Sequence, residues 1–268
     1  NTQHLLIERQ GPVETWTMND LATRNALNDA MVSELLDACA RAAQDATLRI
    51  VVLTGANGAF CAGGSLGGFA SLIGQPLQDG QSDPLLAMNR GFGDLLHALS
   101  ALPQLLVARV DGPAMGGGFG LVCCADHVIA TERAVLGTPE VTLGLPPAQI
   151  APFVWQRLGE SAARQCLLQG LSYSAEHALR LGLVNELVSS TDDSAWPATR
   201  ARLLRAAPGA VASTKQLLAR LRPPMPDLRE AAAKAFAQGL RSAEAARGLT
   251  AFARKQTAPW AAHRETPP

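Results

Sequence analysis

Apolar and polar residues follow two different periods along the first half of the chain. Runs of β-branched residues that end at glycine predict strands, and apolar residues three and four apart predict helices. Residues 49–55 (RIVVLTG) have the first pattern, and residues 28–45 have the second, with Asn28 placed to cap the helix. By the same rules, strands are predicted at 4–10, 13–19, 49–55, 105–111, 127–131 and 135–138, and helices at 28–45 and 85–101.

Polar and glycine-rich segments separate these elements. Residues 74–84 are rich in Gly, Gln, Asp and Ser, which predicts a surface loop. The glycine-dense turn at 112–120 is expected to open an apolar helix that ends near Ala125. Beyond Ala148 the chain is Ala-rich, mainly helical in pattern and punctuated by prolines. Strand–helix alternation followed by a helical tail predicts an α/β fold with a C-terminal helical region.

Composition narrows the class of protein. The 268 residues are 47% apolar and carry 23 basic and 23 acidic side chains, so no global charge favours nucleic acid or a membrane surface as partner. The five cysteines form no pattern with metal-ligand spacing, and we expect reduced thiols and no metal site. No apolar run approaches the roughly 20 residues of a membrane span, and no signal pattern opens the chain. The expected location is the cytoplasm.

Two glycine-rich turns carry the first candidate chemistry. Residues 59–66 (AFCAGGSL) follow one predicted strand, and residues 112–120 (GPAMGGGFG) follow another. Glycine lets the backbone approach a ligand closely, and the first amides of a helix have no partner within that helix. Two such turns, each giving one N–H, suit an anion such as the oxygen of a thioester enolate.

Phosphate and dinucleotide motifs do not fit these turns. The GGGFG segment departs from G-x-G-x-x-G, and no acid follows it at the distance expected of a dinucleotide site. No Gly-Lys-Ser/Thr sequence follows either turn, which excludes a P-loop.

Together these segments resemble the crotonase (enoyl-CoA hydratase/isomerase) superfamily. The resemblance runs from about Leu5 to Lys255 and rests on the order of several short motifs. They are RNALN at 24–28, VVLTGANGAFCAGGSL at 51–66, VDGPAMGGGFGLVCCAD at 110–126, GTPE at 137–140 and GLVNELV at 182–188. The resemblance implies a ββα spiral core at residues 1–190 and a helical trimerisation region at 191–268.

The family resemblance assigns roles to residues of both turns. It implies that the amides of Gly64 and Gly117 bind the thioester oxygen and that Glu140 is the catalytic carboxylate. Contacts to coenzyme A, which enters as part of the substrate and not as a separate cofactor, are implied for a further set of residues. These are Arg24, Ala62, Gly63, Ser65, Leu66, Phe252 and Lys255. The implied partners are an acyl-CoA thioester and further copies of the chain, as a homotrimer or homohexamer.

One position departs from the hydratases of this family. They commonly carry a second glutamate three residues after the middle glycine of the second turn, and here that position is Gly120. Gln149, just past Pro146-Pro147-Ala148, is a candidate for a compensating polar group. An apolar pocket would raise the pKa of Glu140 and make it a usable base near neutral pH.

Three functions remain open from the sequence. The first is an enoyl-CoA hydratase. Residues 145–154 (LPPAQIAPFV) resemble a loop of glutaconyl-CoA hydratases that act on branched acyl chains, which implies a branched or carboxylated enoyl-CoA as substrate. The second is a Δ3–Δ2 enoyl-CoA isomerase that uses Glu140 alone. The third is a non-catalytic acyl-CoA binder that lost its chemistry at Gly120, although a pure binder gains nothing from a carboxylate at the reacting carbon.

Overall fold

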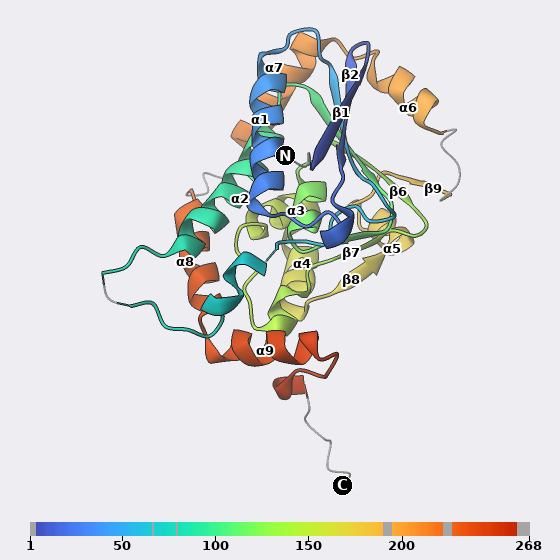
Figure 1. Cartoon of the computed structure of the whole chain (residues 1–268). Coiled ribbons are helices and arrows are strands. Elements are labelled where there is room, and N and C mark those ends of the chain that lie inside the picture. Colours follow the sequence, from blue (N-terminus) through green and yellow to red (C-terminus); the bar gives the residue numbers. More distant parts are fainter. Residues whose placement is uncertain (1–3, 66, 79, 190–194, 222–226, 262–268) are drawn as a thin grey trace.

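The computed structural model describes residues 4–65, 67–78, 80–189, 195–221 and 227–261 (Figure 1). Within these residues, six strands form a larger sheet in the order β1-β2-β3-β4-β6-β9, and three form a smaller sheet in the order β5-β7-β8. The larger sheet is parallel from β2 to β9, and β1 is antiparallel to β2. The strands are β1 (Leu5–Gln10), β2 (Val13–Met18), β3 (Ile50–Gly55), β4 (Leu105–Val110), β5 (Pro113–Met115), β6 (His127–Thr131), β7 (Val135–Gly137), β8 (Ser172–Ser174) and β9 (Glu186–Val188).

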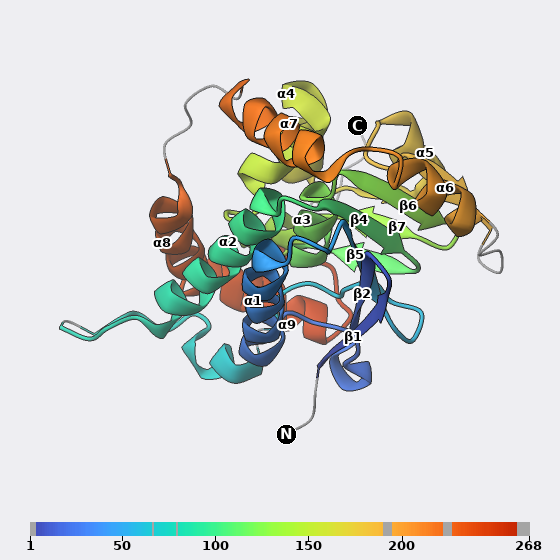
Figure 2. The same cartoon turned by 90° about the horizontal axis from the view of Figure 1, so that it is seen from above.

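Helices surround both sheets (Figure 2). In Figures 1 and 2, α1 and α2 lie on one side of the larger sheet, and α8 packs beside α2. The α-helices are α1 (Asp29–Gln44), α2 (Pro84–Ala101), α3 (Gly117–Cys123), α4 (Ala151–Gln169), α5 (Ala175–Arg180), α6 (Ala195–Leu203), α7 (Pro208–Leu221), α8 (Arg229–Leu240) and α9 (Ala243–Ala253). The 3-10 helices are η1 (Leu21–Thr23), η2 (Gly67–Leu72), η3 (Pro139–Leu143) and η4 (Pro259–Ala261).

The chain repeats a unit of two strands and a helix. β4 enters the larger sheet and is followed by β5 in the smaller sheet and then by α3. β6 and β7 repeat this order before η3 and α4. After β3, Cys61 forms an isolated parallel bridge with Ala114 of β5, so this turn of the chain also reaches the second layer. The α/β prediction is confirmed, and the spiral of ββα units accounts for both sheets.

Most elements predicted from the hydrophobic pattern are confirmed. β3 and β4 are the buried apolar runs, and α1 begins after Asn28, whose side chain accepts the Met31 amide hydrogen as an N-cap. Within the described residues of the predicted loop, 74–78 and 80–83, the chain forms no helix or strand.

Three predictions are corrected. The glycine-dense turn contains the short strand β5, and α3 ends at Cys123 instead of Ala125. The region beyond Ala148 contains two strands, β8 and β9, besides its helices. Each of these strands has only three residues and forms because a neighbouring strand offers an edge, β7 for β8 and β6 for β9. Such short pairings leave no periodic pattern in the sequence.

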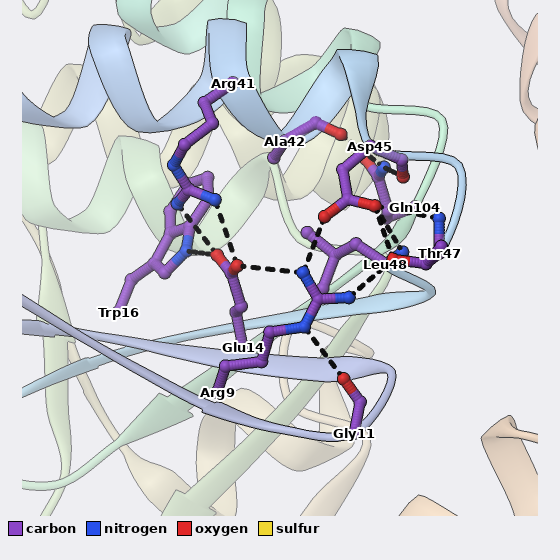
Figure 3. A network of polar contacts seen from close by, with 10 residues as sticks. All are labelled: Arg9, Gly11, Glu14, Trp16, Arg41, Ala42, Asp45, Thr47, Leu48 and Gln104. Atoms are coloured by element: carbon purple, nitrogen blue, oxygen red, sulfur yellow. Dashed lines mark hydrogen bonds and ion pairs between the residues drawn. The ribbon is translucent and has the colours of Figure 1, made fainter.

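A buried carboxylate ties the first hairpin to the first helix. Glu14 of β2 accepts hydrogen bonds from both terminal nitrogens of Arg41 in α1, at 3.0 and 2.8 Å, and from the Trp16 indole at 3.0 Å (Figure 3). Arg9 lies 3.7 Å from the same carboxylate and also pairs with Asp45 just after α1. This network fixes the C-terminal end of α1 against the first hairpin.

The C-terminal helices do not form one separate layer. In Figure 1, α6 and α7 lie at one end of the molecule and α9 lies at the other. α9 packs against η3. Within the described residues no helix is both long and apolar enough to cross a bilayer. The role of residues 191–268 in trimerisation stays a prediction.

Candidate active site

The first glycine turn is held in place by the segment at residues 24–28. The Leu27 amide donates to the Gly63 carbonyl at 2.8 Å, and the Ser65 amide donates to the Leu27 carbonyl at 3.1 Å. Asn25, which is buried and has a φ of +61°, donates from its side chain to the Ala59 carbonyl at 2.8 Å. The conformation of residues 59–65 is therefore set by backbone bonds to a segment that is distant in sequence.

The second turn brings its amide to the first. Gly116 has a φ of +54° and donates its amide to the Gly137 carbonyl at 2.8 Å, which leaves Gly117 as the first residue of α3. A Cβ placed on Gly117 would lie 3.6 Å from the Gly64 nitrogen. The two predicted oxyanion residues are therefore neighbours in space although 53 residues separate them.

Neither amide of this pair has a hydrogen-bond partner in the described part of the chain. The first amides of a helix have no acceptor within the helix, which explains the free N–H of Gly117. The Gly64 amide remains free because the bonds of this turn are made by Gly63 and Ser65 on either side. Two free N–H groups this close can bind one developing negative oxygen.

Glu140 lies in the first turn of η3 and points toward the second glycine turn. A Cβ placed on Gly116 would lie 2.7 Å from Glu140 Oε1, so the carboxylate rests against the bare Cα of that glycine. The other oxygen, Oε2, is enclosed and has no hydrogen-bond partner among the described residues. Burial raises the pKa of Glu140 to about 7, although its own backbone amide lowers the pKa in part. A carboxyl group with this pKa can take or give a proton near neutral pH.

These groups share one cavity of about 170 Å³. Its polar wall contains the Gly64 and Gly117 turns and Glu140, and the remaining surface is largely apolar. The apolar part comes from α1, α2, α8 and the segments around η3. Its residues are Leu27, Val32, Met88, Phe92, Met115, Leu143, Leu145, Pro146, Pro147, Ile150 and Phe236. The cavity suits an acyl chain whose thioester lies at the two free amides.

The predicted coenzyme A residues divide into two groups. Ala62, Gly63 and Ser65 line the same cavity as Gly64 and Glu140, and the contact with the adenine end of coenzyme A that the resemblance implies for them stays a prediction. Arg24 is exposed, ends η1 with a φ of +56°, and accepts the Ala62 amide hydrogen at its carbonyl. Leu66 lies outside the described residues.

Phe252 and Lys255 are not brought to this cavity. Phe252 is 68% exposed and lines a separate groove between η3, α4 and the end of α9, together with Trp260. Lys255 is exposed just beyond α9 and has a φ of +54°. Neither residue lines the acyl cavity, and their predicted contact with coenzyme A stays a prediction.

The space beside Gly120 is occupied by Ile150, and Gly120 does not line the cavity. A Cβ at this position would meet Ile150 Cγ2 at 2.4 Å, and Gly120 is not among the lining residues. The auxiliary residue Gln149, next to Ile150, does line the cavity and is 5% exposed. Its side-chain nitrogen donates to Asn89 Oδ1 at 2.9 Å and to the Arg229 carbonyl at 3.0 Å.

Asn89 is a lining residue that the sequence reasoning missed. It belongs to the buried face of α2 together with Leu85 and Gly93, at i, i+4 and i+8. A lone amide on the apolar face of an amphipathic helix was the available signal, since a buried polar side chain requires a partner. Phe92 and Phe236 were missed because only tertiary packing brings α2 and α8 to the same wall.

Comparison with known proteins agrees with this geometry. Residues 8–263 match the enoyl-CoA hydratase/isomerase family. A 2,3-dehydroadipyl-CoA hydratase of Escherichia coli is 32% identical over 216 residues, 80% of this chain and 81% of that protein. The crystal structure of an enoyl-CoA hydratase/isomerase from Marinobacter aquaeolei is 39% identical, with a TM-score of 0.77 over 97% of this chain and 100% of that one. Pseudomonas aeruginosa AtuE is 40% identical, with a TM-score of 0.76 over 96% and 99% of the two chains. The chain therefore belongs to the enoyl-CoA hydratase/isomerase family and is an acyl-CoA enzyme of the crotonase superfamily.

Proposed function

We propose that this protein is an enoyl-CoA hydratase, which adds water across the double bond of a 2-enoyl-CoA thioester. The observation that carries the proposal is the desolvated carboxylate of Glu140, whose Oε2 has no hydrogen-bond partner among the described residues, in one cavity with the free amides of Gly64 and Gly117. The two amides stabilise the negative charge that moves onto the thioester oxygen during addition.

Glu140 serves as the proton carrier in this mechanism. Water attacks Cβ of the enoyl group, the electron pair of the double bond moves toward the thioester oxygen, and Glu140 takes a proton from the water. Glu140 then delivers that proton to Cα as the enolate collapses, so the carboxylate is regenerated and H and OH have been added. A pKa near 7 allows both steps to proceed at neutral pH.

An isomerase is the second candidate, and one observation favours it. The position of the second family glutamate is Gly120, and Ile150 fills the space that its side chain would need. Glu140 alone can move a proton from Cα to Cγ of a 3-enoyl-CoA, since the same amides would hold the oxygen of the dienolate that forms between the two steps.

A non-catalytic binder fits the cavity less well. A binding site for a neutral acyl chain has no use for a buried carboxylate with one oxygen left unpaired, because its burial lowers stability without improving the binding of that chain. Retention of Glu140 in this environment therefore favours an enzyme.

The substrate we propose has an uncharged, branched acyl chain. Of the described lining residues none is Lys, Arg or His, so a terminal carboxylate would lack a cationic partner there. Residues 146–150, part of the segment similar to branched-chain glutaconyl-CoA hydratases, form one wall of the cavity. The dicarboxylic chain in the name of the Escherichia coli relative is less compatible with this lining.

Assembly and location are proposed with the function. Exposed Leu168 and Phe252 along the groove beside α9 support a contact between copies, in keeping with a homotrimer or homohexamer. The five cysteines are free and buried, in keeping with the reducing cytoplasm.

The test is turnover in ¹⁸O-labelled water. Straight, branched and carboxylated 2-enoyl-CoA esters and a 3-enoyl-CoA are each incubated with the protein and the products analysed by mass spectrometry. Incorporation of labelled oxygen at C3 supports hydration, and migration of the double bond without label supports isomerisation. Neither reaction with any ester would overturn the enzyme proposal, and the Glu140→Gln variant is the control for both reactions.

A further inference from the structure

We propose that Asn89 and Gln149 form the water-binding site of this cavity and take the place of the second carboxylate that Gly120 lacks. The inference rests on the proposed hydration, because only hydration requires a bound water to attack the acyl chain. Asn89, which lies in none of the family motifs, would position the attacking water. Gln149 would bind the same water in a defined orientation.

The orientation of both amides follows from one obligate acceptor. The Arg229 carbonyl can only accept, so the Gln149 atom 3.0 Å from it is the NH₂ nitrogen. The same nitrogen lies 2.9 Å from Asn89, which must therefore present its oxygen to it. Gln149 Oε1 and Asn89 Nδ2 are left over as one acceptor and one pair of donors.

The two remaining atoms belong to side chains that line the cavity. Both side chains are nearly buried, 6% exposed for Asn89 and 5% for Gln149, and both line the cavity that contains Glu140. Neither atom has a partner in the described part of the chain, and neither is among the fully enclosed polar atoms without one. Each atom therefore keeps some accessible surface through which it can bind a further partner.

An acceptor beside a donor is the complement of a water molecule or a hydroxyl group. Water can accept from Asn89 Nδ2 and donate one hydrogen to Gln149 Oε1, which leaves its second hydrogen for Glu140. After addition to Cβ, the product hydroxyl keeps both amide contacts. A thioester oxygen or an alkyl chain could use only one of the two groups or neither.

The packing places this pair beside the missing carboxylate. Ile150, which fills the space next to Gly120, directly follows Gln149. The same loop therefore occupies the space that a Gly120 side chain would need and provides the side-chain amide of Gln149. Gly93 of α2 makes room for it, because a Cβ on Gly93 would stand 2.4 Å from Gln149 Oε1. Gly93 therefore offers a way to displace the amide without altering any polar group.

The test compares two glycine variants of the same helix. Gly93→Ala pushes the flexible end of Gln149 away, whereas Gly91→Ala, two residues before it in α2, meets no atom within 4 Å. Gln149→Met is the direct variant. Hydration is followed with crotonyl-CoA and 3-methylcrotonyl-CoA, and enolate formation by exchange of the Cα protons of butyryl-CoA in heavy water.

The expected result is a split between the two reactions. Gly93→Ala and Gln149→Met each lower hydration by at least about tenfold while Cα exchange, which needs Glu140 but no bound water, stays within about twofold of wild type. Gly91→Ala changes neither reaction.

If Gln149→Met fails to fold, the comparison of Gly93→Ala with wild type is sufficient for the test. Unchanged hydration in a folded Gly93→Ala or Gln149→Met variant, or equal loss of both reactions, overturns the water site and leaves the proposed hydratase standing. A wild-type protein that exchanges protons but hydrates neither ester overturns both proposals.

Discussion

The carboxylate of Glu140 lies against the bare Cα of Gly116. Oε1 would stand only 2.7 Å from a Cβ at that position, and Gly116 also has a φ of +54°. The glycine before α3 thus has two structural effects, since it turns the chain so that the Gly117 amide is free and it leaves room for the carboxylate of Glu140.

Replacing Gly116 should therefore disable the enzyme more than it destabilises the fold. In Gly116→Ala the new methyl group displaces Glu140, and we expect the turnover number to fall by at least about 100-fold. Steady-state kinetics would measure this. Gly11→Ala is the control, because Gly11 also has a positive φ, +61°, but a Cβ there meets no atom within 4 Å. The control should lose roughly 1 kcal/mol of stability and keep its activity.

Exchange of Cα protons should titrate with Glu140. The reaction needs the carboxylate form, so its rate rises with pH and reaches half its plateau near the raised pKa of about 7. Exchange of butyryl-CoA in heavy water, measured at several pH values on either side of neutrality, checks this, and Glu140→Gln should show no such rise. An inflection near 4.5, the ordinary value, would contradict desolvation of this carboxyl group.

The same pKa shift predicts a stability cost in alkaline solution. The folded protein holds the Glu140 proton more tightly than the unfolded chain, so its stability falls as pH rises from 4.5 to about 7 and the cost is constant above that. At about 1.4 kcal/mol per pKa unit the penalty is about 3 kcal/mol. Urea unfolding at pH 8 should find Glu140→Gln more stable than wild type, and the difference should vanish near pH 4.5. A variant that is less stable at pH 8 would show that Glu140 has a stabilising partner.

Patterns of neighbouring residues in the sequence predicted most of the strands and helices around the site. The remaining features depend on contacts between residues that are distant in sequence. The strand at Ile50–Gly55 and the cap at Asn28 depend on neighbours in sequence, and both were predictable. The neighbouring positions of Gly64 and Gly117 came only from the resemblance, since the backbone bonds that join the two turns are long-range. The filling of Gly120 by Ile150 could not be predicted, because no sequence pattern reports which side chain occupies the space beside a glycine.

The Glu14–Arg41 pair should contribute far more to stability than a surface pair. The Glu14 side chain is 3% exposed, and its hydrogen bonds to Arg41 are the main cause of its lowered pKa. Arg41→Ala removes two hydrogen bonds from a buried carboxylate and leaves Arg9, 3.7 Å away, as its counter-charge, and we expect a loss of about 2 kcal/mol at pH 7 in chemical denaturation. The loss should shrink in acid, as the pH falls below 4.5 through the lowered folded pKa of Glu14. Arg133→Ala, which breaks the exposed pair with Asp111, is the control and should cost less than about 1 kcal/mol. Equal losses in the two variants would contradict the importance of burial.

Restoring an acid at Gly120 should fail unless Ile150 is made smaller at the same time. Gly120→Glu brings a side chain within 2.4 Å of Ile150 Cγ2, and such overpacking in a core costs about 2 kcal/mol. Ile150→Ala alone leaves a cavity and costs roughly 3 kcal/mol. Because each change relieves the defect of the other, the double variant should be more stable than the sum of the two losses by at least about 1 kcal/mol. A double-mutant cycle by urea unfolding measures this coupling, and additive losses would mean that the two positions do not compete for space. If the new carboxylate reaches the cavity, the double variant should also hydrate crotonyl-CoA faster than Ile150→Ala at an unchanged rate of Cα exchange.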